Sequence, residues 1–138
     1  MVISSYHDKR TTLLRSQIID ICKKNKGPLT VPEIQKALFV IKVLPHKTSL
    51  YRNIELLCAQ NLLEEVILDA NVKHYEISSA HHHHMVCTEC SGIKCIASLS
   101  MEKSVRKMEK EITETMRFHI QDHQFSFFGV CDSCFCKL

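Results

Sequence analysis

The sequence lacks the features that would place the protein in a membrane or on a secretory route. No apolar run is long enough to span a bilayer, and the first residues show no basic segment followed by an apolar one. We therefore expect a cytoplasmic protein with no membrane association. With 45% apolar and 24% charged residues, the chain of 138 residues has room for one ordinary domain or two small ones.

Signatures of zinc- and thiol-dependent enzymes are also missing. There is no His-Glu-x-x-His pair of zinc ligands, and neither C-x-x-C pair lies in a βαβ pattern, as a thiol oxidoreductase would require. Two matched C-x-x-C pairs also leave no open coordination position for catalysis. We therefore expect that the protein is not an enzyme.

Charge is distributed unevenly along the chain. Residues 1–60 carry ten Lys/Arg and four Asp/Glu, a net charge of +6, whereas residues 61–138 have a net charge of −3. Six of the eight cysteines and seven of the nine histidines also lie in the second half. A basic first half suits a polyanion such as DNA, and an acidic half rich in Cys and His suits cations.

Two cysteine pairs have the same internal spacing, Cys87 with Cys90 and Cys131 with Cys134. Each C-x-x-C pair offers two thiolates, so together they complete a tetrahedral four-cysteine zinc site. Without a secretion signal, this pattern favours metal binding over a disulfide scaffold. Cys22 and Cys58 instead lie on apolar helix faces, which predicts core positions.

Residues 1–78 predict a winged helix-turn-helix plan. Apolar spacing indicates helices over 11–25, 31–40 and 47–60, with Thr30 as the N-cap of the second. Two β-rich stretches, 62–68 and 73–78, are separated by the turn residues 69–71.

Residues 79–138 predict a second, smaller domain. The apolar pattern predicts a helix over 100–116 and short strands over 85–90, 93–97, 117–121 and 124–128. An apolar stripe on that helix, Met101, Val105, Met108, Ile112 and Met116, indicates core or dimer packing. Because about 60 residues make a small core, zinc and a partner subunit would have to add stability.

The run His81–His84 precedes the first cysteine pair. In an extended segment, alternate side chains point to opposite sides. His82 and His84 can therefore serve one metal, and His81 and His83 another. The position of the run inside the chain, leading into Cys87, argues against an accidental tract.

These motifs resemble the ferric uptake regulator (Fur) family over nearly the whole chain. The segment T-S-L-Y-R-N-I-E-L-L resembles the family's recognition helix, and H-H-H-H-M-V-C-T-E-C and F-F-G-V-C-D-S-C resemble its metal motifs. The resemblance implies an α+β fold, with an N-terminal winged helix-turn-helix DNA-binding domain (1–78) and an α/β dimerisation domain with a four-cysteine zinc site (79–138).

The resemblance also implies three metal sites. The structural zinc ligands would be Cys87, Cys90, Cys131 and Cys134, with Cys95 and Cys136 as extra thiols of open role. The sensory site would use Glu76, His82 and His84, with Glu64 either as a further ligand or as a solvated residue of the wing. An auxiliary site would use His81, His83, Glu102 and His123, with His119 as a rival for His123. Carboxylate and imidazole ligands accept Zn(II), Fe(II), Mn(II) or Co(II), so the sensed metal stays open.

The function that follows is a homodimeric transcriptional repressor of metal-uptake genes. Structural Zn(II) and regulatory Zn(II) or Fe(II) would be its cofactors, and a double-stranded DNA operator its partner. The expected DNA contacts are Tyr51, Arg52, Lys47, Thr48, Arg15 and Arg10. Zinc sensing is favoured over iron sensing because Pro28 stands where the iron-sensing branch has a histidine. The alternatives are a peroxide sensor of the same family and a zinc-storage or chaperone module.

Overall fold

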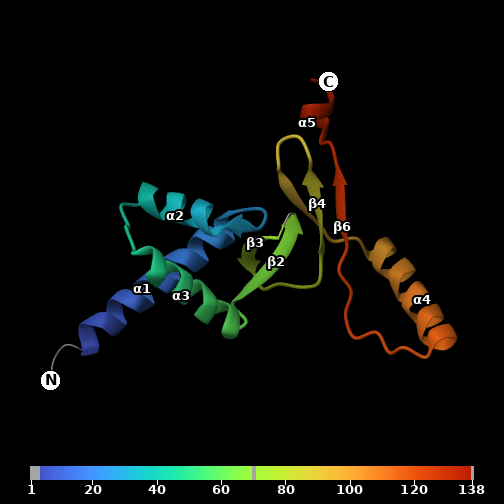
Figure 1. Ribbon diagram of the computed structural model, residues 1–138, viewed down its shortest axis with the longest axis horizontal. Coiled ribbons are helices and arrows are strands. Elements are labelled where there is room, and N and C mark those ends of the chain that lie inside the picture. Colours follow the sequence, from blue (N-terminus) through green and yellow to red (C-terminus); the bar gives the residue numbers. More distant parts are fainter. Residues whose placement is uncertain (1–3, 70, 138) are drawn as a thin grey trace. The chain divides into compact units, whose positions relative to one another are not determined.

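The structure is a computed structural model that describes residues 4–69 and 71–137 (Figure 1). Side chains are described at 12–68 and 71–137, so the predicted DNA contact of Arg10 lies outside the described side chains. The chain divides into two compact units, Met1–Ser79 and Ala80–Leu138. No helix in the described part of the chain is long and apolar enough to cross a membrane.

The first unit combines three helices with a small antiparallel sheet. Its elements are α1 (Ser4–Lys24), β1 (Leu29–Thr30), α2 (Val31–Val40), α3 (Lys47–Ala59), β2 (Leu63–Asp69) and β3 (Val72–Ile77). The strand order is β1-β3-β2, and β2 and β3 form the hairpin that the sequence predicts as the wing. The winged-helix plan is confirmed, although α1 starts at Ser4 rather than at residue 11.

Local chemistry explains where α2 and the hairpin turn begin. The backbone N–H of Thr30 donates to Glu33 Oε2 at 2.7 Å, and the N–H of Glu33 donates to Thr30 Oγ1 at 3.4 Å, a reciprocal cap for the first turn. Asn71 takes the left-handed conformation, with φ 62°, which asparagine tolerates in tight turns.

A single apolar core holds the first unit together. The completely buried side chains include Ile18, Ile34, Leu38 and Leu50, from all three helices. Cys22 and Tyr75 are buried in the same cluster. This packing fixes the orientation of α3, because its apolar face points inward and its Tyr51–Arg52 face outward.

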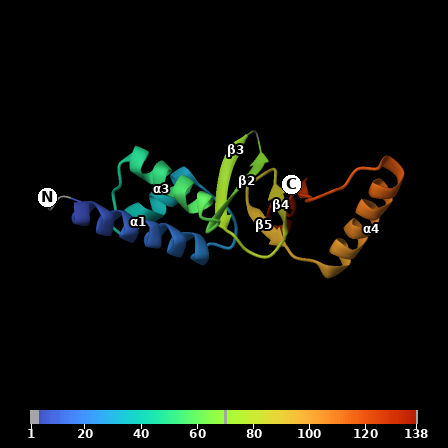
Figure 2. The same cartoon turned by 90° about the horizontal axis from the view of Figure 1, so that it is seen from below.

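The second unit is a three-stranded mixed sheet with one long helix (Figure 2). Its elements are β4 (His83–Cys87), β5 (Ile93–Ile96), α4 (Leu99–Met116), β6 (Ser126–Gly129) and α5 (Asp132–Phe135). Central β4 pairs antiparallel with β5 and parallel with β6. Among the described side chains of this unit, the buried apolar ones are Val86, Cys87 and Val105, so its hydrophobic core is small.

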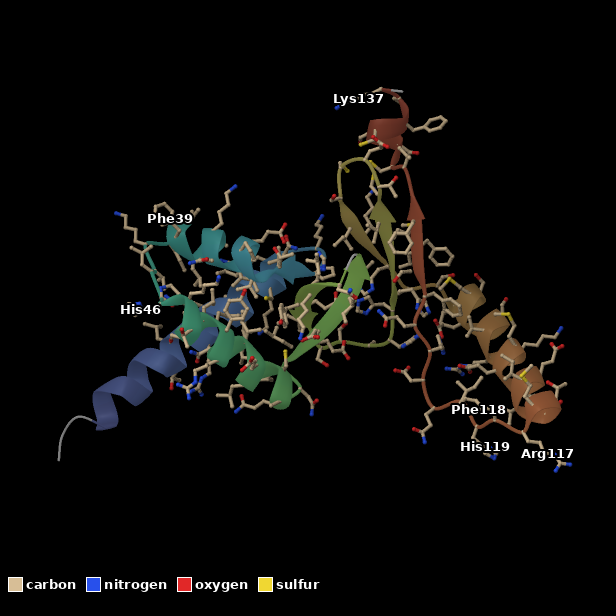
Figure 3. The ribbon with its side chains drawn as sticks, viewed as in Figure 1. Phe39, His46, Arg117, Phe118, His119 and Lys137 are labelled. Atoms are coloured by element: carbon tan, nitrogen blue, oxygen red, sulfur yellow. The ribbon has the colours of Figure 1, made fainter. Side chains whose placement is uncertain are left out.

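Two expectations for the second unit need correction. The run 117–121 is not a strand, because Arg117 takes a left-handed conformation (φ 51°) that ends α4 and turns the chain into a loop. Figure 3 shows Arg117, Phe118 and His119 in that loop. The next strand starts at Ser126, two residues later than the apolar run suggests. On the α4 stripe, Val105 is buried, but Met116 is 75% exposed in this single chain.

Candidate metal centres

The four cysteines of the two C-x-x-C pairs come together at one end of the mixed sheet. Their sulfur atoms lie within 4.8 Å of one another, and the Sγ atoms of Cys90 and Cys131 are 3.9 Å apart. The parallel pairing of β4 with β6 sets this arrangement, because it places Cys87 beside Gly129, two residues before Cys131. The gathering of all four cysteines confirms what their spacing predicts, and the donor set fits tetrahedral zinc.

The turn that carries Cys90 depends on a glycine that the sequence analysis did not single out. A Cβ atom at Gly92 would lie 3.2 Å from Cys90 Sγ, tighter than ordinary contact. The Gly92 carbonyl also accepts a hydrogen bond from the Cys87 backbone N–H at 2.9 Å. This small residue therefore lets the loop close tightly over the sulfur atoms.

Electrostatics within the group favour a bound cation. The backbone N–H of Cys131 donates to Cys87 Sγ at 3.3 Å and is the main reason that the Cys87 pKa falls to about 6. Hydrogen bonding to Cys131 and Cys90 raises the pKa of the Cys134 thiol to about 12. Four thiols packed this closely cannot all ionise by themselves, and Zn(II) would supply the missing positive charge.

The histidine run divides between the two faces of β4. The rings of His82 and His84 lie 4.8 Å apart between centroids, and those of His81 and His83 lie 4.7 Å apart. His83 and His84 are buried although each is polar. Adjacent side chains on a strand point to opposite faces, so the run supplies two separate nitrogen pairs.

One of these pairs, His81 and His83, meets Glu102 from α4 and His123 from the loop before β6. The ligand atoms of these four residues lie within 4.8 Å of one another. His83 Nε2 is 2.7 Å from Glu102 Oε1, and the Nε2 atoms of His81 and His123 are 2.9 Å apart. Desolvation opposes ionisation of Glu102, but the hydrogen bond from His83 and the charges of the surrounding imidazoles hold its pKa below the ordinary value.

Glu109 is an additional member of this neighbourhood that the sequence did not indicate. Glu109 follows Glu102 on α4 by about two helical turns, and its Oε1 atom lies 2.7 Å from His123 Nδ1. A carboxylate at that nitrogen leaves Nε2 free to face the other donors, as in many metal-bound histidines. His119, the rival candidate, is exposed in the loop after α4 and lies outside the group.

The other histidine pair has a neighbour within the second unit that the sequence did not indicate. Ligand atoms of His82, His84 and Cys95 lie within 4.8 Å of one another. Cys95 stands on β5 directly opposite His84. The sequence left the role of Cys95 open, and only the strand register reveals this contact.

The two carboxylates expected at the sensory site lie in the first unit. Glu64 on β2 and Glu76 on β3 are direct cross-strand partners. Glu64 is exposed, and Glu76 is only 8% exposed. Opposed carboxylates repel each other unless a proton or a cation intervenes.

The outward face of α3 carries most of the expected DNA contacts. Lys47, Thr48, Tyr51 and Arg52 are all exposed, and Lys47 Nζ lies 5.9 Å from the centre of the Tyr51 ring. Arg15 is different, because its Nε donates to Oδ1 of the buried Asn53 at 3.0 Å. At least this nitrogen of Arg15 is used to hold α1 against α3.

A sequence profile of the Ferric uptake regulator family matches residues 7–128. The Ferric uptake regulation protein of Synechococcus elongatus is 36% identical over 89 residues, which cover 63% of this chain and 58% of that protein. The matched stretch therefore spans little more than half the length of that relative.

Solved structures show the same fold. The ferric uptake regulator of Francisella tularensis, solved with iron, superposes with a TM-score of 0.75 at 22% identity, covering 88% of this chain and 90% of that one. The Campylobacter jejuni peroxide stress regulator gives a TM-score of 0.73 at 19% identity, covering 96% of each chain. Structures named for different stimuli thus share one architecture.

Proposed function

The chain belongs to the ferric uptake regulator family, and on this premise we propose that it is a metal-dependent DNA-binding transcriptional repressor that acts as a homodimer. Proteins of this family are transcription regulators rather than enzymes. The observation that carries the proposal is the presence of three separate groups of metal-ligand donors in a chain that also presents a basic, exposed α3 face.

The three groups differ in the chemistry that they offer. The four thiolates would bind structural Zn(II) tightly and keep it. The His82–His84 pair would form the sensory site with Glu76, which precedes His82 by six residues and is kept within reach by that short connection. Glu64, the cross-strand partner of Glu76, is a further candidate. His81, His83, Glu102 and His123 would form an auxiliary site.

The α3 face would read the DNA. Tyr51 would contact bases in the major groove, and Arg52, Lys47 and Thr48 would contact phosphates. Arg15 and Arg10 would add phosphate contacts from α1. Phosphate contacts of this kind make the affinity depend on salt rather than on sequence.

Metal would control DNA binding through its unequal affinity for two arrangements of the protein. A ligand shifts a conformational equilibrium only by the difference between its affinities for the two states. Metal at the sensory site would favour the arrangement that binds an operator. Zn(II) and Fe(II) are the candidate co-repressors, and peroxide sensing through bound iron is the alternative within the family.

The test is DNA binding measured against buffered metal. Random duplexes are selected with the protein in Zn(II) buffer, and separately in Fe(II) buffer without oxygen, and the affinity of the selected duplex is then titrated against free metal. His84→Ala should lose the metal response and retain the thiolate-bound zinc. His81→Ala is the matched control and should lose less, because it faces the auxiliary donors.

Two results would contradict the proposal in different ways. If His81→Ala loses the response and His84→Ala keeps it, the sensory and auxiliary roles are exchanged. If DNA binding never depends on metal, a zinc-storage role becomes the better explanation.

The Arg52→Ala variant tests the DNA-binding face. It should weaken binding to every duplex and reduce the salt dependence of the DNA affinity by about one charge.

A further inference from the structure

We propose that the Cys95 thiolate is a ligand of the His82–His84 site and makes that site selective for zinc. This inference rests on the regulatory function proposed above and specifies the metal that the same site would take. Ligand atoms of His82, His84 and Cys95 lie within 4.8 Å of one another, all within the second unit. Two imidazoles and one thiolate already make a three-ligand metal site.

The geometry of the β4–β5 pair brings these three side chains together. Cys95 is the direct antiparallel partner of His84, and directly opposed residues place their side chains on the same face of a sheet. His82 precedes His84 by two residues and therefore shares that face. The adjacent His83 points to the other face and contacts Glu102, so neighbouring histidines serve different groups.

Burial and hydrogen bonding prepare the two imidazoles for a metal. His84 is 3% exposed, which fixes its ring, whereas Cys95 is exposed and reachable by an entering ion. His82 Nδ1 lies 3.0 Å from the carbonyl oxygen of Ala80, a contact in which the ring nitrogen must donate. That bond places the lone pair of His82 on Nε2, the tautomer that a metal-binding imidazole needs.

The thiolate decides which metal fits. Zn(II) accepts a four-coordinate set of sulfur, nitrogen and carboxylate oxygen, whereas Mn(II) prefers oxygen-rich sets of higher coordination number. On binding, the Cys95 S–H bond breaks, a sulfur–metal bond forms, and one proton passes to solvent. One sulfur and two nitrogens form a donor set that suits zinc better than the harder cations.

Cobalt absorption tests the assignment directly. The full-length protein is first loaded with zinc at the four-cysteine group, and one equivalent of Co(II) is then added without oxygen. Wild-type protein should develop a thiolate-to-cobalt charge-transfer band in the near ultraviolet. Cys95→Ser should lose that band, whereas Cys136→Ser, which removes another exposed thiol, should keep it. Metal analysis of the same samples checks that the zinc is retained.

The Cys95→Asp variant tests whether the site needs the sulfur atom itself or only some metal ligand at this position. This variant should keep the visible cobalt bands, lose the charge-transfer band, and lower the ratio of Zn(II) to Mn(II) affinity by at least about tenfold. An unchanged charge-transfer band in Cys95→Ser, with zinc retained, would overturn the proposal. An unchanged affinity ratio in Cys95→Asp would overturn the claim of selectivity.

The outcome is independent of whether the protein represses genes. Metal-independent DNA binding together with a band that requires Cys95 would refute the proposed function and leave the ligand assignment standing. Metal-dependent DNA binding together with a band that does not require Cys95 would support the proposed function and refute the ligand assignment.

Discussion

Cys87 of the second unit and the two cysteines of the first unit have opposite surroundings. In the first unit, burial raises the pKa of Cys22 to about 11 and also raises that of Cys58. In the second unit, backbone N–H groups lower the pKa of Cys87 to about 6. The first environment keeps a thiol neutral as an apolar core residue, and the second prepares a thiolate for a metal.

The same contrast holds for the cores. The first unit buries apolar side chains from three helices and two strands, including Ile34, Leu38 and Leu63. Several of the most buried positions in the second unit, namely His83, His84 and Cys87, are metal-ligand types. We infer that hydrophobic packing stabilises the first unit, whereas metal binding stabilises the second.

The largest expected effect comes from removing one thiolate. Cys131→Ser should release one zinc per chain and lower the melting temperature of the second unit by at least roughly 10 °C, because metal-binding free energy there contributes to folding. Calorimetry with zinc analysis measures both. Cys136→Ser is the control, and full zinc content in Cys131→Ser would refute the comparison.

The corresponding change in the first unit is a cavity in its apolar core. Ile34 is completely buried, so Ile34→Ala should cost about 2–5 kcal/mol of unfolding free energy. Its zinc content should stay at the wild-type level. The separation of the two kinds of stability fails if this variant loses zinc or unfolds only together with the second unit.

A smaller effect, on metal affinity, should follow from weakening the contact that orients one imidazole. Glu109→Gln weakens the contact that orients His123 and should reduce metal affinity at the auxiliary group by roughly 10–100-fold. Competition with a chromogenic chelator would measure this loss, with Glu111→Gln as the exposed control on the same helix. Equal affinities in the two variants would show that Glu109 has no part in positioning the ligand.

The smallest effect concerns alkaline pH. Burial raises the pKa values of Cys22 and Tyr75, to about 11 and about 12, above those of the unfolded chain. A raised acid pKa stabilises the fold fully below the unfolded value, and this stability is lost as pH rises from about 9 toward 11. For Cys22 the loss should reach about 1 kcal/mol by pH 10, and Cys22→Ala should remove that part of the slope in denaturant titrations at several pH values.

Much of this organisation could be predicted from local sequence. The N-cap Thr30 and the apolar periodicity predict the helices of the first unit, and the spacing of the cysteine pairs predicts their gathering. The strand predicted at 117–121 was wrong, because nothing in its apolar pattern reveals that Arg117 would take a left-handed conformation.

Contacts that depend on strand register and helix packing could not be predicted from the sequence. Cys95 meets His84 only because β4 and β5 pair in one particular register. Glu109 reaches His123 across 14 residues of chain, and Arg15 reaches Asn53 across 38. Polar partners of this kind depend on tertiary distances, which neither periodicity nor residue spacing encodes.

The separation of the two cysteine pairs along the chain has a consequence for biosynthesis. Cys131 follows Cys87 by 44 residues, so at 5–20 residues per second the ribosome adds the second pair roughly 2–9 seconds after the first. By then the whole sequence of the first unit has been synthesised, and that unit can begin to fold without metal. Until the second pair has been added, the Cys87–Cys90 pair can offer only two of the four thiolates of a tetrahedral zinc site. The four-thiolate centre can therefore be completed only after the second pair has been made, whereas the core of the first unit, which holds no metal ligands of this centre, can form before it.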